Sequence, residues 1–79
     1  YNIDMKHPVG VHLTSDAVLI TDDSDGSLSK YTLSPSQADL IWTCKGLTRP
    51  CGVTTDESGL IYVTKTRPPN ILILSPEGE

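Results

Sequence analysis

The hydrophobic positions of this chain fall in short runs separated by turn-forming residues. The runs are rich in Val, Ile, Leu, Thr and Tyr, and Gly, Pro, Asp and Ser lie between them. Such runs are typical of β-strands. No longer stretch places its apolar residues at helical spacing, so we expect no helix. The predicted strands cover residues 10–13, 18–21, 28–33, 40–45, 52–55, 60–64 and 71–75.

These runs belong to an internal repeat. The segment His-Pro-Val-Gly-Val at 7–11 recurs as Arg-Pro-Cys-Gly-Val at 49–53, about 42 residues later, and the runs that follow each copy also match. A period of about 40 to 50 residues with four strands per repeat is typical of β-propeller blades. The pattern therefore predicts an all-β chain with one blade at 6–46 and a second at 47–79 that lacks its fourth strand. Residues 1–5 are predicted to be the orphan fourth strand of a neighbouring blade.

The second repeat carries the more specific motifs. Pro-Cys-Gly-Val opens it at 50–53, Asp-Glu-Ser-Gly precedes Leu-Ile-Tyr-Val over 56–63, Asn-Ile follows at 70–71, and Ser-Pro-Glu-Gly ends it at 75–78. In these motifs the chain resembles the NHL repeat, most closely that of the tripartite-motif (TRIM-NHL) proteins. The first repeat lacks the glycine before its second strand and the Asn before its third. The resemblance implies two four-stranded blades of a six-bladed propeller that binds RNA or protein, often attached to a ubiquitin-ligase RING module.

The size of the chain raises the question of how the ring is completed. A chain of 79 residues buries a modest fraction of its surface and is marginal as an isolated domain. The chain does not begin with Met, and we expect it to be part of a longer protein. The missing blades then come from that longer chain, which we favour, or from head-to-tail copies in which residues 1–5 pair with the strand over 71–74.

The candidate binding residues are basic. Propeller geometry places Lys45, Arg49, Lys65 and Arg67 on one face of the ring, conventionally the top, where phosphate groups or an acidic peptide would bind. The alternative is an ordinary solvated rim. The net charge is −4, and the acidic segment 22–25 lies on the same face, where it would repel phosphate. No exposed aromatic residue is predicted there to stack against bases.

The sequence contains no recognisable catalytic motif. We therefore expect a non-catalytic interaction platform for protein or RNA, with no cofactor. The resemblance to the TRIM-NHL proteins implies that this platform is the substrate-recognition part of a TRIM-type ubiquitin ligase. No apolar run is long enough to span a membrane, and no membrane partner is expected. Free thiols at Cys44 and Cys51 fit a reducing cytoplasm, and a disulfide between them is the alternative for a secreted protein.

Two metal sites are weaker alternatives. His12 lies in the innermost predicted strand, so the chain is alternatively a fragment of a propeller enzyme with a metal in its central channel. The segment Asp-Asp-Ser-Asp-Gly at 22–26 has the oxygen ligands of a calcium loop. Laid on the EF-hand pattern, however, it puts Thr21 and Thr32 where acidic ligands belong, and we predict a simple turn.

Overall fold

The computed structural model describes residue 3, residues 5–66 and residues 69–79, and the described chain is all-β. None of these residues belongs to a helix, and hence none forms an apolar helix able to cross a membrane. The strands are β1 (Pro8–Leu13), β2 (Ala17–Asp22), β3 (Ser27–Leu33), β4 (Ala38–Cys44), β5 (Pro50–Thr55), β6 (Ile61–Thr66) and β7 (Pro69–Leu74).

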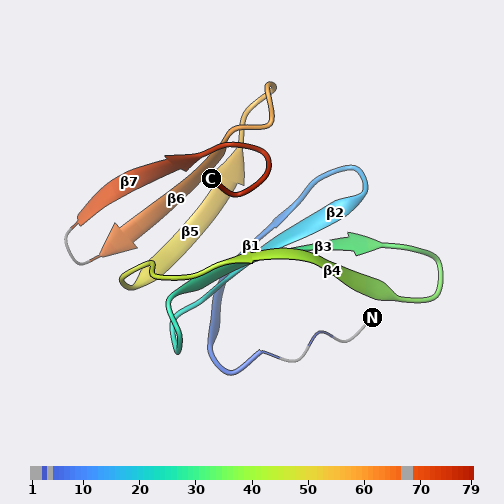
Figure 1. Cartoon of the computed structure of the whole chain (residues 1–79), viewed down its shortest axis with the longest axis horizontal. Helices are drawn as coiled ribbons and strands as arrows, with labels where there is room; N and C mark the ends of the chain where they lie inside the picture. Colours follow the sequence, from blue (N-terminus) through green and yellow to red (C-terminus); the bar gives the residue numbers. More distant parts are fainter. Residues whose placement is uncertain (1–2, 4, 67–68) are drawn as a thin grey trace.

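The strands form two antiparallel sheets (Figure 1). Strands β1 to β4 pair in sequence order in one sheet, and β5 to β7 pair in the same way in the other. Each predicted strand is present, and the observed bounds differ only at the ends, so that Lys45 and Ser75 lie just outside their strands. The prediction of a strand over 1–5 falls largely outside the described residues; of those described, Ile3 and Met5 are in no strand.

Both sheets carry the same irregularity at the same position of the repeat. The register between the first two strands of each sheet shifts next to a glycine, Gly10 in β1 and Gly52 in β5. At each bulge the glycine amide donates a hydrogen bond to a threonine hydroxyl on the next strand. The donor–acceptor distance is 2.9 Å for Gly10 and Thr21 and 2.7 Å for Gly52 and Thr64. The internal repeat therefore extends from the sequence to the backbone geometry.

The two sheets pack against each other through their first strands, β1 and β5 (Figure 1). The fully buried Thr21 hydroxyl donates to the carbonyl of Cys51 at 2.9 Å, from one sheet to the other. A Cβ added at Gly10 would lie 2.2 Å from that carbonyl oxygen, so only glycine fits at this approach. The neighbouring sheet is therefore the cause of the crowding around Gly10.

The hydrophobic core lies between the sheets. Leu19 and Leu28 of the first sheet meet Ile61, Val63 and Leu74 of the second. Leu47, in the connection from β4 to β5, joins this cluster, and its amide donates to the carbonyl of Gly26 at 2.8 Å. The connection therefore holds the second sheet against the first. Burial of these side chains is the main favourable contribution to the packing.

Candidate functional site

The four predicted binding residues do not form one cluster. Lys45 and Arg49 are exposed at opposite ends of the connection from β4 to β5, and they line different grooves. Lys65 is half-buried in β6, in register with Pro50. Arg67 lies outside the described residues. The structure thus divides the predicted basic face into at least two parts.

Arg49 lies at the groove between the sheets. This groove has a volume of about 200 Å³ and is lined by His7, Val9, Asp23, Arg49, Pro50, Cys51 and Thr66. The backbone of Arg49 is left-handed, with φ at 48°, a conformation that costs a non-glycine residue about 1–2 kcal/mol. The Thr66 amide donates to the Arg49 carbonyl at 3.2 Å and helps to hold this conformation. Strain of this kind is often kept where a side chain has a function.

The described charged residues around this groove leave the Arg49 guanidinium free to pair with an acidic ligand. Within the described residues, the one basic side-chain nitrogen within 4 Å of a carboxylate oxygen is His7 Nδ1, which lies 3.6 Å from Asp23 Oδ2. Arg49 therefore has no described carboxylate at ion-pair distance. Its guanidinium offers several N–H donors in a planar arrangement, which suits a carboxylate or phosphate ligand.

Lys45 has a more acidic neighbourhood. It lines a groove together with Lys6, Asp22 and Asp25, at the turn between β2 and β3. Opposite charges at this groove reduce its attraction for an anion. Arg49 is therefore the stronger candidate of the two for binding an acidic group.

Asp22 stabilises the turn that we predicted at 22–26 from the sequence. One of its carboxylate oxygens accepts hydrogen bonds from the amide and hydroxyl of Ser24, and the other accepts from the amides of Lys6 and His7. The Ser24 hydroxyl, followed by these amides, holds the pKa of Asp22 below its ordinary value. The predicted turn is confirmed. No group of three potential metal ligands occurs among the described residues, including those of this turn.

Two alternatives from the sequence remain, a metal bound by His12 and a disulfide between Cys44 and Cys51, and these residues lie near the interface between the sheets. The His12 Nε2 atom in β1 lies 3.0 Å from the hydroxyl of Thr55 in β5, which is a second polar contact between the two sheets. Cys44 is half-buried and Cys51 is exposed, and both thiols are free. Of the three, Cys44 packs against the core between the sheets.

The Thr21 and Thr64 hydroxyls are the polar groups whose role the sequence did not reveal. The repeat aligns the two threonines, but threonine is common in strands and the match indicates nothing more. A sequence signal that could have indicated the role is the threonine that follows the glycine of each repeat, 11 residues after Gly10 and 12 residues after Gly52.

The described residues thus define a class: an all-β chain of two antiparallel sheets that repeat one another. No protein-family model matches the chain, and no curated protein matches it.

Proposed function

We propose that the two sheets are consecutive blades of an NHL-type β-propeller and that the chain is a non-catalytic platform for binding a protein ligand. The repeated glycine bulge and the packing of β5 on β1 support the blade assignment. The proposal follows from the repeat architecture, in which stacked units present their loops along one face.

The groove at Arg49 is the proposed binding site, and an acidic peptide segment is its proposed ligand. The observation that carries this assignment is the exposed Arg49, held in a left-handed conformation beside the groove. The overall charge of −4 and Asp23 in the groove disfavour a nucleic-acid backbone, which presents many phosphates at once. A peptide carboxylate needs only one such contact.

The proposal is tested by following backbone amide shifts of the full chain during titration with a short polyglutamate peptide at low salt. We expect the largest shifts at Arg49 and Thr66. The variant Arg49→Gln removes a charge-assisted hydrogen bond and should weaken binding about tenfold or more. Lys30→Gln, which removes an equal charge from strand β3, is the matched control and should bind as the parent chain does.

Two results would contradict this proposal. One is the absence of any peptide-induced shift at low salt. The other is binding of the peptide that Arg49→Gln leaves unchanged. A parallel titration with oligouridylate distinguishes a protein ligand from an RNA ligand. If the RNA binds more tightly than the peptide at the same amides, the ligand of this groove is a nucleic acid and the proposed peptide ligand is wrong.

A further inference from the structure

The outer face of the second sheet is an uncovered apolar surface. Its groove has a volume of about 420 Å³ and is lined by Gly52, Val53, Thr54, Tyr62, Thr64 and Ile71. Ile71 is 62% exposed and Ile73, further along β7, is 55% exposed. Adjacent apolar side chains on one open sheet face mark an interaction surface more often than scattered single ones do.

The residues of this outer face correspond in the repeat to the residues of the first sheet that pack against the second sheet. Gly52 corresponds to Gly10 and Thr64 to Thr21 in the repeat, with the same bulge and the same amide-to-hydroxyl bond. Ile71 pairs with Thr64 as the core residue Leu28 pairs with Thr21. In the first sheet Gly10 and Thr21 contact Cys51 of β5, and Leu28 belongs to the core between the sheets. In the second sheet the same positions are open.

The Thr64 hydroxyl is poised to donate a hydrogen bond. Thr21 accepts from Gly10 and donates across the interface to the Cys51 carbonyl at 2.9 Å. Thr64 likewise accepts from Gly52, but within the described residues its hydrogen has only the distant Gly52 carbonyl, at 3.5 Å. A Cβ at Gly52 would meet only the Thr64 hydroxyl, at 3.0 Å. The space that Cys51 fills at Gly10 is therefore free at Gly52.

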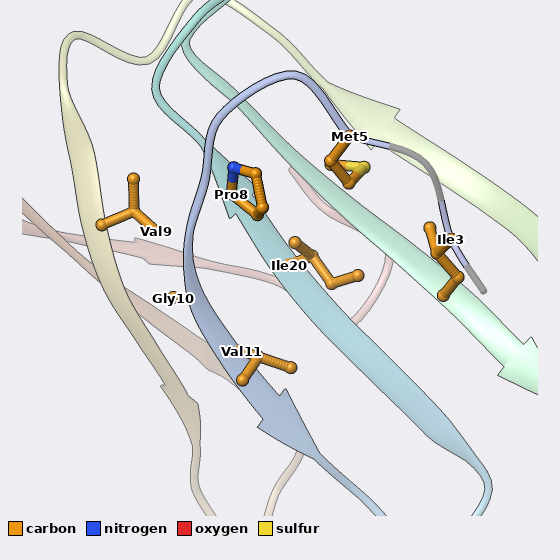
Figure 2. Close-up of a pocket in the computed structure, with 7 residues that line it drawn as sticks. All are labelled: Ile3, Met5, Pro8, Val9, Gly10, Val11 and Ile20. Atoms are coloured by element: carbon orange, nitrogen blue, oxygen red, sulfur yellow. The ribbon is translucent and has the colours of Figure 1, made fainter. Parts of the chain in front are cut away.

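The opposite end of the chain presents the complementary surface. The first sheet has an outer groove of about 360 Å³ between β1, β2 and the segment that carries Ile3 and Met5 (Figure 2). Val11 borders this groove and is 66% exposed. Its counterpart in the repeat, Val53, packs against the core between the sheets. The two outer faces of one chain thus correspond, in the repeat, to the two faces that pack together between its sheets.

We propose that the outer face of the β5–β7 sheet is a docking site for strand β1 of a second copy of this chain. In this contact the Thr64 hydroxyl donates to the Val9 carbonyl of the second copy, as Thr21 donates to Cys51 within one chain. Val11 of the second copy covers the groove beside Ile71. The contact is heterologous, so each bound copy leaves one site of each kind open, and the assembly extends or closes into a ring. The inference does not depend on the ligand proposed for Arg49.

Sedimentation of the full chain across a range of concentrations tests this docking. The weight-average mass measured for the parent protein should rise with its concentration. Thr64→Val should raise the dissociation constant about two- to tenfold through loss of one hydrogen bond. Gly52→Ala should abolish association, because its Cβ would meet the incoming carbonyl as closely as at Gly10. Thr48→Val, at an exposed position in the β4–β5 connection, is the matched control and should associate as the parent does.

A mixing experiment makes the result independent of damage to the fold. Gly52→Ala blocks the docking face and leaves β1 intact, whereas Val11→Asp places a charge on β1 and leaves the docking face intact. Each variant alone should be a monomer with the circular dichroism spectrum of the dilute parent chain, and an equimolar mixture should give heterodimers and nothing larger. A parent chain that stays monomeric at the highest concentration, or a mixture that stays monomeric, would overturn the proposal.

Discussion

Substituting Gly10 by alanine should destabilise the packing of the two sheets far more than the same substitution at Gly52. The added Cβ of Gly10→Ala would lie 2.2 Å from the Cys51 carbonyl oxygen and 3.0 Å from the Thr21 hydroxyl. The backbone of Cys51 cannot rotate away as a side chain would, so the sheets must separate locally. Overpacking of this kind costs about 1–3 kcal/mol, and loss of the hydrogen bond from Thr21 to Cys51 adds about 1–3 kcal/mol.

The expected cost of Gly10→Ala is therefore about 2–6 kcal/mol, a large part of the stability of a small domain. Gly52→Ala is the matched control, because its Cβ meets only one exposed hydroxyl, and it should change stability by less than about 1 kcal/mol. Urea unfolding followed by circular dichroism at low concentration measures both values. Equal effects of the two substitutions would refute the argument, because the strands themselves are equivalent and only the neighbouring sheet distinguishes the sites.

Three further predictions follow from single contacts. Thr21→Val should lower the free energy of unfolding by about 1–3 kcal/mol, because it leaves the Cys51 carbonyl without its donor and the Gly10 amide without its acceptor, and urea unfolding measures this loss. Arg49→Gly should leave stability unchanged or raise it by about 1 kcal/mol while weakening peptide binding, because glycine relieves the left-handed strain; a clear loss of stability would be the contrary result. The Asp56 carboxylate accepts a hydrogen bond from the Tyr62 hydroxyl at 2.9 Å, and this bond lowers the pKa of Asp56 as the Ser24 hydroxyl lowers the pKa of Asp22. The stabilisation that these two carboxylates give the fold is therefore present at neutral pH and is lost as the pH falls below about 4. Thermal melts should show that loss, and it should be smaller in Asp56→Asn.

The strands and the repeat could be predicted from the sequence because both depend on short local patterns of residues. Short runs of apolar and β-branched residues bounded by Gly, Pro, Asp and Ser define the strands, and the recurrence of Pro-x-Gly-Val at 50–53 aligns the two repeats. Only the ends of the strands, such as Lys45, differed. Strand ends depend on individual backbone hydrogen bonds, which hydrophobic patterning does not reveal.

The candidate sites were less predictable because they depend on contacts between the sheets. Assigning loops to one face of a propeller grouped Lys45 with Arg49, but the connection between them places the two side chains at separate grooves. Likewise, Thr21 and Thr64 are equivalent in the sequence, and only the position of the Cys51 carbonyl makes one buried and leaves the other exposed. Such differences arise from tertiary packing.

The packing of β5 on β1 is the observation on which both the blade assignment and the docking proposal depend. Nuclear Overhauser effects between the ring protons of His12 and the β- and γ-protons of Thr55, recorded on the dilute chain, test it most directly. We predict a clear inter-sheet effect, because His12 Nε2 in β1 lies 3.0 Å from the Thr55 hydroxyl in β5. Strong effects within each sheet, with none between His12 and Thr55, would show that the sheets do not pack as described.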